Sequence, residues 1–208
     1  MITPKYFYHE LIKNNISFFS GVPDSLLKNF CFYVSDSAEK ENHIIAANEG
    51  NALSLGIGYH LATNKTPLIY MQNSGLGNII NPLLSLADSD VYSIPMLLMI
   101  GWRGEPGLKD EPQHKKQGRV MLDLLKAMEI PFSTLSPSDD NESAEKTIKE
   151  CLSNIMKSNS PHALIIKKGT FLSYTPKNAP KEEYSLNRED AIKSVSYTHL
   201  TLPTNREV

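Results

Sequence analysis

Residues 43–65 read HIIAANEGNALSLGIGYHLATNK and contain a strand-to-helix unit of an α/β fold. The first five residues, HIIAA, are an apolar run that predicts a short buried strand. Residues from Asn51 to Thr63 are mostly small or apolar and predict a closely packed helix. Asn48 precedes that helix and is a favourable N-cap residue. A single carboxylate, that of Glu49, therefore lies where the strand passes into the helix.

Glu49 has two interpretations at this stage. A glutamate in the first turn of a helix complements the helix dipole, which stabilises the helix by about 0.3–1 kcal/mol. That role explains a charge near solvent. Glu49 instead follows an apolar run and precedes Gly50, Gly56 and Gly58, which allow close approach of backbone or ligand. A buried carboxylate needs a partner, so a functional role is the alternative.

The alternation of strand and helix continues along the chain. Further strands are predicted at 17–22, 66–73, 94–102, 132–135 and 162–171, with helices at 3–16, 24–40, 77–88, 119–130 and 143–157. Continuous apolar strands are typical of parallel sheets that are covered by helices on both faces. The sequence therefore predicts an α/β fold with a doubly wound parallel sheet of about six strands. Ligands of such folds bind near the carboxyl ends of the strands.

The composition excludes several classes of partner. The chain has 208 residues and a formal net charge of −2, so no electrostatic argument favours nucleic acid or an anionic membrane. No apolar run approaches the ~20 residues of a membrane span. Cys31 and Cys151 have no metal or redox spacing and are expected to be buried free thiols. We expect a cytoplasmic protein that has no nucleic-acid or membrane partner.

Three segments of the chain differ in character. Residues 1–172 carry the α/β pattern and are expected to form one domain. Residues 173–187 hold two prolines and several charges, as a linker does. Residues 188–208 begin as a helix, REDAIKSV, and continue as SYTHLTLPTNREV, which has no periodicity. We expect the start of a second domain followed by a non-native tail; a disordered native terminus is the alternative.

Two polar junctions invite a functional interpretation. Gly75 and Gly77 flank a strand-to-helix turn whose backbone N–H groups could face a ligand, although the pattern alone favours a tight turn capped by Asn73 or Ser74. The polar segment 103–118 is basic and is predicted to be a loop that suits an anionic substrate. His114, within it, could transfer protons near neutral pH or be a solvated histidine.

Four stretches together resemble the pyrimidine-binding domain of thiamine-diphosphate-dependent decarboxylases: FFSGVPDSLLK, AANEGNALSLGIGYHLAT, YMQNSGLGNIINPLLSL and GWRGEPGLKDEPQHKKQG. The similarity runs from about Lys5 to Phe171. It is strongest to the phosphonopyruvate decarboxylases, with the α subunits of sulfopyruvate decarboxylases next. In this family the glutamate at the position of Glu49 hydrogen-bonds N1′ of the aminopyrimidine ring. The resemblance therefore implies a catalytic, cofactor-binding Glu49 and thiamine diphosphate as cofactor.

The resemblance also implies roles for other residues at the junctions. The residues expected against the aminopyrimidine are Gly75, Gly77 and Asn78. Those expected to deliver protons near the reacting carbon are Gln113 and His114. Those expected to bind the substrate, including its anionic head, are Asp24, Ser25, Arg103 and Lys109.

The resemblance also implies a partner domain, a metal ion and a reaction. The family binds the diphosphate and Mg²⁺ through a Gly-Asp-Gly motif in a second domain, and these 208 residues contain no such motif. We therefore expect a carboxy-lyase that is active only with a diphosphate-binding domain or β subunit, in a homo-oligomer. The expected reaction converts 3-phosphonopyruvate to phosphonoacetaldehyde and CO₂. Alternatives are the α subunit of a 3-sulfopyruvate decarboxylase and a non-catalytic binding or assembly protein of the same fold.

Overall fold

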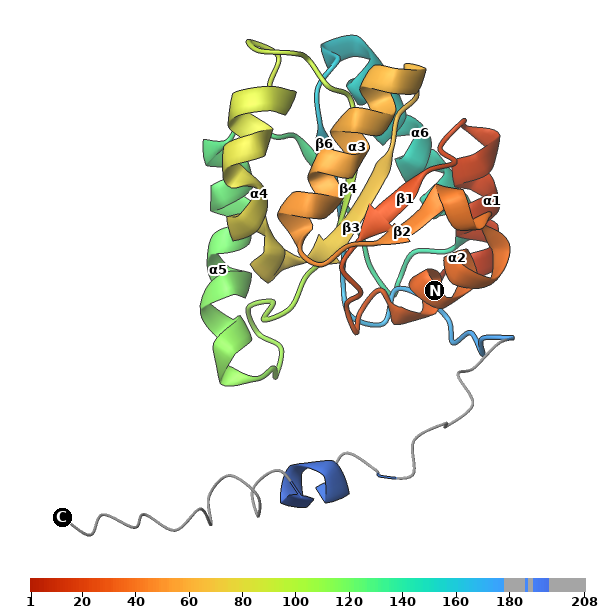
Figure 1. The fold of residues 1–208 in the computed structure, drawn as a ribbon, viewed down its shortest axis with the longest axis vertical. Helices are drawn as coiled ribbons and strands as arrows, with labels where there is room; N and C mark the ends of the chain where they lie inside the picture. Colours follow the sequence, from red (N-terminus) through yellow and green to blue (C-terminus); the bar gives the residue numbers. More distant parts are fainter. Residues whose placement is uncertain (178–185, 187–188, 195–208) are drawn as a thin grey trace, which may run out of the picture. The chain divides into compact units, whose positions relative to one another are not determined.

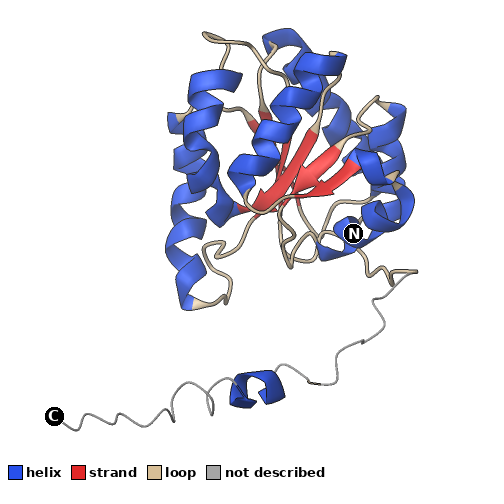
Figure 2. Ribbon diagram, viewed as in Figure 1, coloured by secondary structure: helices blue, strands red, loops and turns tan. Residues whose placement is uncertain are grey.

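Six parallel strands form a single sheet in the order β2-β1-β3-β4-β6-β5 (Figures 1 and 2). The strands are β1 (Phe19–Gly21), β2 (His43–Ile45), β3 (Leu68–Gln72), β4 (Leu97–Gly101), β5 (Phe132–Leu135) and β6 (His162–Ile166). Every neighbouring pair is parallel. The apolar side chains of β4 and β6 are buried on both faces, as continuous apolar runs predict. The predicted sheet is confirmed.

The helices cover both faces of this sheet. One core cluster joins the sheet to α1 (Pro4–Lys13), α2 (Lys28–Ser37) and α6 (Asn141–Ser158). The other joins it to α3 (Glu49–Thr63), α4 (Leu76–Pro82) and α5 (Pro112–Ala127). The fold is therefore doubly wound, as predicted. Because α2 follows β1 on one face and α4 follows β3 on the other, the topological switch point lies between these adjacent strands.

The structure, a computed structural model, describes residues 1–177, 186 and 189–194. One unit spans Met1–Pro176, and a second unit begins at Lys177. Within the second unit, residues 189–194 are helical. Most of the predicted linker and the whole of the predicted tail, 196–208, lie outside the described residues.

Helix capping follows the sequence closely at two helices. The Asn48 side chain accepts a hydrogen bond from the Asn51 backbone N–H at 2.9 Å and caps α3. Thr3 caps α1, and Pro4 occupies the first helical position, where its missing N–H costs nothing. Both caps were predicted.

The predicted buried strand HIIAA is wrong in extent and in burial. Strand β2 has only three residues, and the side chain of Ile45 is 59% exposed. The reason is its place in the sheet, because β2 is an edge strand that pairs only with β1. Glu49 is half-buried and so does not lie in the interior.

Three helix boundaries also differ from the predictions. Helix α2 begins at Lys28, because the Asp24 carboxylate accepts from Leu26 N–H and closes a turn before the helix. Helix α5 begins at Pro112, which occupies the first helical position, so the second half of the predicted loop is helical. Helix α4 ends at Pro82 and is followed by a π-helical turn, Leu83–Ala87, where one longer helix was predicted.

The two cysteines are buried free thiols, as predicted. Burial raises the pKa of Cys31 to about 12 and that of Cys151 to about 11, so neither is a reactive thiolate near neutral pH. Among the helices that the structure describes, none has both the length and the apolar character needed to cross a membrane.

Candidate active site

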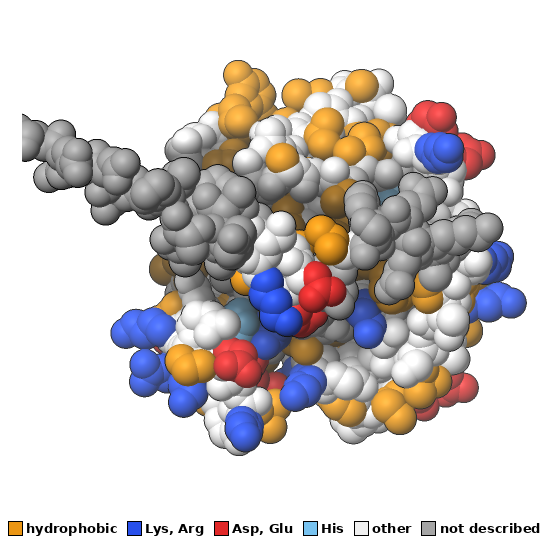
Figure 3. All heavy atoms as spheres, turned by 60° about the horizontal axis from the view of Figure 1, so that its bottom comes forward, with side chains coloured by type: hydrophobic (Ala, Val, Ile, Leu, Met, Phe, Trp, Pro, Cys, Tyr) orange, Lys and Arg blue, Asp and Glu red, His pale blue; other side chains and the backbone are white. Residues whose placement is uncertain are grey.

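The polar junctions lie together at one edge of the sheet, because parallel strands all end on the same side. This edge is at the bottom of Figure 1, where β3 ends and α3 and α5 begin. Figure 3 turns this face toward the viewer and shows Lys and Arg side chains around it, with Asp or Glu between them. The expected site residues therefore come from the correct edge for ligand binding in an α/β fold.

The Glu49 carboxylate is held by residues from the junction after β3. Its Oε2 accepts a hydrogen bond from the Asn78 side-chain amide at 2.7 Å. A Cβ atom at Gly75 would lie 2.4 Å from Glu49 Cγ, so no side chain fits at position 75 while Glu49 keeps this conformation. Three residues that the sequence connected with the cofactor, Glu49, Gly75 and Asn78, are thus in direct contact. Gly77, the fourth, is exposed with open space around it.

Glu49 is oriented by its place in α3. It is the first residue of the helix, directly after the Asn48 cap, where a negative charge is stabilised by the helix dipole. Glu49 Oε1 receives no hydrogen bond within the part of the chain that the structure describes. One carboxylate oxygen is therefore fixed by Asn78, and the other can accept a hydrogen bond from a ligand.

Arg103 follows β4, and both its backbone and its guanidinium are hydrogen-bonded within the chain. Its backbone N–H and C=O pair with the side-chain amide of Asn73, which directly follows the neighbouring strand β3. Its guanidinium donates from Nε and Nη2 to the two carboxylate oxygens of Asp110, and from Nη1 to the Ser25 hydroxyl at 2.9 Å. Arg103 and Ser25, both predicted to contact the substrate, therefore lie together. The Nε and Nη2 donors of Arg103, however, are already hydrogen-bonded to the Asp110 carboxylate.

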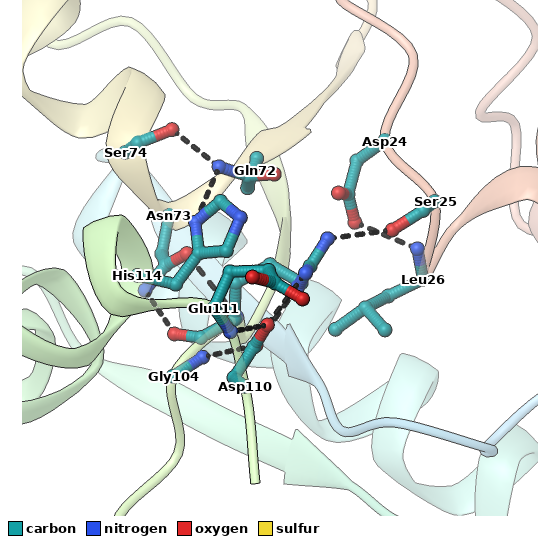
Figure 4. A network of polar contacts seen from close by, with 11 residues as sticks. Asp24, Ser25, Leu26, Gln72, Asn73, Ser74, Gly104, Asp110, Glu111 and His114 are labelled. Atoms are coloured by element: carbon teal, nitrogen blue, oxygen red, sulfur yellow. Dashed lines mark hydrogen bonds and ion pairs between the residues drawn. The ribbon is translucent and has the colours of Figure 1, made fainter.

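Asp110 was not singled out in the sequence, where it looks like one charge among many in a polar loop. Besides Arg103, it accepts hydrogen bonds from the backbone N–H groups of Gly104 and Glu111, at 2.7 and 2.8 Å (Figure 4). The guanidinium of Arg103 in particular holds the pKa of Asp110 well below its usual range. An aspartate in a polar loop gives no distinctive sequence signal, because the pairing depends on how the loop folds back.

Asp24 is a buried carboxyl group at the end of β1. Its Oδ2 accepts from the Leu26 N–H at 3.0 Å and lies where a Cβ of Gly101 would otherwise be. Its Oδ1 is buried and has no hydrogen-bond partner among the residues that the structure describes. Burial raises the pKa of Asp24, partly offset by backbone N–H groups and Arg103. Such a group can hold a proton at a higher pH than a solvated aspartate does.

His114 lies across the site from Asp24 (Figure 4). It belongs to the first turn of α5, and its Nδ1 is 3.5 Å from the side-chain amide nitrogen of Gln72. Gln72 also donates to the Ser74 hydroxyl at 2.6 Å, which links His114 to the turn after β3. Gln113 and Lys109, two other predicted site residues, are exposed, and neither side chain makes a hydrogen bond or ion pair within the described chain.

A known family matches this chain. The family model of the thiamine pyrophosphate enzyme, N-terminal TPP binding domain, matches residues 1–130. The chain belongs to this family. The matched residues include the junctions that carry Glu49, Arg103 and His114. The fold and the resemblance predicted from the sequence are thereby confirmed at the level of the family.

Two kinds of decarboxylase are among the similar proteins. A phosphonopyruvate decarboxylase of Streptomyces viridochromogenes is 33% identical over 151 residues, which are 72% of this chain and 36% of that protein. The α subunit of a sulfopyruvate decarboxylase of Methanocaldococcus jannaschii is 38% identical over 159 residues, 76% of this chain and 89% of that subunit. The match thus spans about a third of the first relative and most of the second.

Solved structures of this fold include larger decarboxylases. A benzoylformate decarboxylase of Polynucleobacter necessarius superposes with a TM-score of 0.60 at 17% identity, covering 95% of this chain and 36% of that one. A 4-hydroxybenzoylformate decarboxylase of Rhodococcus jostii gives 0.58 at 16% identity. At such identities the similarity shows that the fold is shared.

Proposed function

We propose that this chain is the pyrimidine-binding half of a thiamine-diphosphate-dependent decarboxylase. The proposed substrate is a 2-oxo acid with a tetrahedral anionic head, and the first candidate is 3-phosphonopyruvate, which would yield phosphonoacetaldehyde and CO₂. The observation that supports this most strongly is the Glu49 carboxylate, held by Asn78 at 2.7 Å and packed on Gly75 at the start of α3.

Glu49 fits the ring of the proposed cofactor by its chemistry. Thiamine diphosphate, when bound, supplies the carbanion stabilisation that a 2-oxo acid needs in order to lose CO₂. Glu49 would share a proton with N1′ of the aminopyrimidine through Oε1, while Asn78 holds Oε2 in place. The bare backbone at Gly75 makes room for the Glu49 side chain, and the open space at Gly77 would let a flat ring approach. A glutamine at position 49 would keep the shape and lose the proton-accepting charge.

Proton transfer to the product is proposed for the opposite side of the site. An imidazole such as that of His114 can act as a general acid or base, and its Nδ1 lies 3.5 Å from the side-chain amide nitrogen of Gln72. The buried Asp24, whose pKa burial raises, would face the substrate as a second proton-holding group. Gln113, exposed at the start of α5, would contact the substrate only when this face is covered.

The head group of the substrate is proposed to bind beside the loop that follows β4, which carries Arg103 and Lys109. Ser25 and Arg103 are already joined at 2.9 Å, and the exposed Lys109 belongs to the same loop. The phosphonopyruvate decarboxylase relative favours a phosphonate head. A sulfonate head is the second candidate, since the match to the sulfopyruvate decarboxylase subunit covers 89% of its length.

The diphosphate and Mg²⁺ are proposed to be bound by a separate diphosphate-binding domain or a β subunit. The name of one relative, an α subunit, supports assembly with a second kind of chain. The half-exposed edge at β2 and Glu49 is where that domain would complete the cofactor site. A homo-oligomer of such units is the proposed assembly.

The experiment that tests this proposal is Glu49→Gln in the chain assembled with its diphosphate-binding partner. Release of CO₂ from 3-phosphonopyruvate and 3-sulfopyruvate is measured at saturating cofactor. We expect kcat to fall by roughly 10²–10⁴, the usual contribution of a positioned acid–base group. The matched control is Glu150→Gln, an exposed glutamate on α6, which should leave the rate unchanged.

Folding of Glu49→Gln should be retained, since the glutamine can still accept a hydrogen bond from Asn78. Circular dichroism and a thermal melt check this point. Unchanged turnover in a well-folded Glu49→Gln assembly would refute the assignment. An assembly in which neither the wild type nor the variant releases CO₂ from any 2-oxo acid would favour the non-catalytic alternative.

A further inference from the structure

A cavity of about 420 Å³ opens beside Arg103, between the turn that follows β1 and the turn that follows β6. Its polar lining residues are Ser25, Asn29, Arg103, Asp110 and Lys168, and Phe171 forms part of its apolar wall. This volume lies within the range of ~300–1,000 Å³ that is usual for small-molecule sites. No sequence pattern singles out Asn29 or Lys168 as part of a binding site.

The acidic residue in this cavity does not oppose an anion. Both oxygens of Asp110 accept two hydrogen bonds each, from the Arg103 guanidinium and from the backbone N–H groups of Gly104 and Glu111. The charges of Arg103 and Asp110 cancel, because the two side chains form an ion pair that is 19% and 15% exposed. Among the lining residues, the remaining full charge is the ammonium group of Lys168.

Two adjacent lysines at the end of β6 differ in their surroundings. Lys167 pairs with the Glu105 carboxylate and lies over the ring of Trp102, at 5.4 Å from the ring centroid. Lys168 lines the cavity and forms no ion pair within the described chain. Lys167 therefore holds the 103–111 loop through Glu105 and Trp102. The ammonium group of Lys168 is left available to a ligand in the cavity.

The backbone around Lys168 is well fixed. The Thr170 hydroxyl donates to the carbonyl oxygens of Lys167 and Leu135, at 2.8 and 3.2 Å, and closes the turn from 167 to 170. Gly169 has a φ of +83°, which a glycine adopts without strain. Thr170 is buried, so its hydrogen bonds are shielded from water. They hold the backbone of the turn that carries Lys168 in place.

Asn29, in the first turn of α2, adds a donor to the lining of the cavity. Its side-chain oxygen accepts from the Tyr174 N–H at 3.2 Å, so its NH₂ group is the part that remains available to a ligand. Together with the Ser25 hydroxyl and Lys168, the cavity presents donors from the segments after β1 and β6 to a region with one net positive charge. Such a set suits a compact oxyanion with several acceptor oxygens.

We infer that Lys168 is a specificity-determining residue that recognises the tetrahedral anionic head of the substrate in this cavity, with Ser25 and Asn29 as additional donors. The inference rests on the proposed function for the identity of the substrate. It differs from the sequence-based expectation, which assigned the head mainly to Arg103 and Lys109. Arg103, paired with Asp110, shapes the cavity and orients Ser25.

The test measures binding of methylphosphonate to the full 208-residue chain by NMR titration. It compares the wild type with Lys168→Ala, Lys168→Arg and Lys157→Ala. Lys157 is an exposed lysine in the last turn of α6, so its removal changes the net charge equally. We expect Lys168→Ala to raise Kd about tenfold, as expected for loss of one charge-assisted contact. Lys168→Arg and Lys157→Ala should stay within about twofold of the wild type.

Three results would overturn the inference. These are absence of saturable binding by the wild type, an equal Kd for Lys168→Ala and the wild type, and an equal weakening by Lys157→Ala. The last result would mean that only net charge matters. A variant that has lost its fold is recognised by circular dichroism, and Lys168→Met then decides, because it keeps a long side chain and removes the charge; a Kd equal to that of the wild type would overturn the inference.

Failure of this inference can be separated from failure of the proposed function. In the assembly with its diphosphate-binding partner, Lys168→Ala should raise KM for an acid with a phosphonate or sulfonate head and leave kcat/KM for pyruvate unchanged. Turnover with equal KM in Lys168→Ala would reject the inference and keep the decarboxylase. Methylphosphonate binding that depends on Lys168, without turnover of any 2-oxo acid, would keep the inference and reject the decarboxylase.

Discussion

The junction that carries Glu49 and the loop that carries Arg103 lie at the same edge of the sheet but are built differently. Glu49 has one side-chain hydrogen bond, from Asn78, and follows the edge strand β2, whose Ile45 is 59% exposed. Arg103 has hydrogen bonds to Asn73, Asp110 and Ser25 through both its backbone and its side chain. The first junction is sparsely bonded, and the second is bonded almost completely within the chain.

This difference indicates that the Arg103 loop and the Glu49 junction have different roles in the site. A loop with its polar groups satisfied can hold a binding surface without help, because each group already has its partner. A half-buried carboxylate with one free oxygen at a sheet edge gains its remaining contacts from a ligand or another domain. We therefore expect mutations in the loop to change stability and mutations near Glu49 to change activity.

The largest stability effect is expected for Gly118→Ala. A Cβ at position 118 would lie 1.8 Å from the carbonyl oxygen of Gly104, and neither atom belongs to a flexible side chain. Helix α5 would have to move away from the loop, at a cost of about 3 kcal/mol or more in the free energy of unfolding. Urea unfolding measures it, with the exposed neighbour Gln117→Ala as control. A loss below about 0.5 kcal/mol would mean that the loop is not rigid.

The next effect, on activity, is expected for Gly75→Ala. The added methyl group would displace the Glu49 side chain, which is flexible, so the chain should still fold. Misplacing a catalytic group by about 1 Å can cost on the order of 10²-fold in rate, and we expect a loss of that order. Steady-state kinetics of the assembled enzyme measure it.

Gly58→Ala is the matched control, because Gly58 lies on α3 with open space around it. It should keep full activity and stabilise the helix by roughly 0.5–1 kcal/mol. Equal activity of Gly75→Ala and Gly58→Ala would contradict the close contact of Glu49 with the turn after β3.

A smaller and pH-dependent effect is expected for Asp110→Asn. Arg103 lowers the pKa of Asp110, so the pair stabilises the fold above the unfolded pKa of about 3.9 and loses this contribution as pH falls below it. The variant should lose about 1–3 kcal/mol at pH 7 and less at pH 3. Urea unfolding at the two pH values measures this difference. The control Asp123→Asn, whose side chain is 81% exposed, should change little; an identical loss at both pH values would argue against the ion pair.

Much of the fold follows from local sequence signals. The apolar runs at 68–72, 97–101 and 162–166 could only be buried strands, and the Asn48 and Thr3 caps follow from residue type. The place of β2 at the edge could not be predicted, because an apolar triplet does not encode which strands flank it. The burial of HIIAA was overestimated for this reason.

The part of the site that is expected to bind the cofactor could be predicted from the sequence. The roles of Glu49, Gly75 and Asn78 were implied by the family resemblance of two strand-to-helix junctions, and the structure brings these three residues into contact. Asp110 and Lys168 were missed, since isolated charges in polar loops usually face solvent. Their roles depend on the fold, which pairs Asp110 with Arg103 and places Lys168 in one cavity with Ser25, and the local pattern does not contain this.

The most direct measurement is the rate of CO₂ release by the wild-type chain assembled with its diphosphate-binding partner and thiamine diphosphate. The substrates are 3-phosphonopyruvate, 3-sulfopyruvate and pyruvate. We predict that an acid with a tetrahedral anionic head is turned over with a kcat/KM at least about tenfold above that of pyruvate, the value of one charge-assisted contact. Equal kcat/KM on pyruvate, or no CO₂ from any of the three acids, would contradict the proposed function.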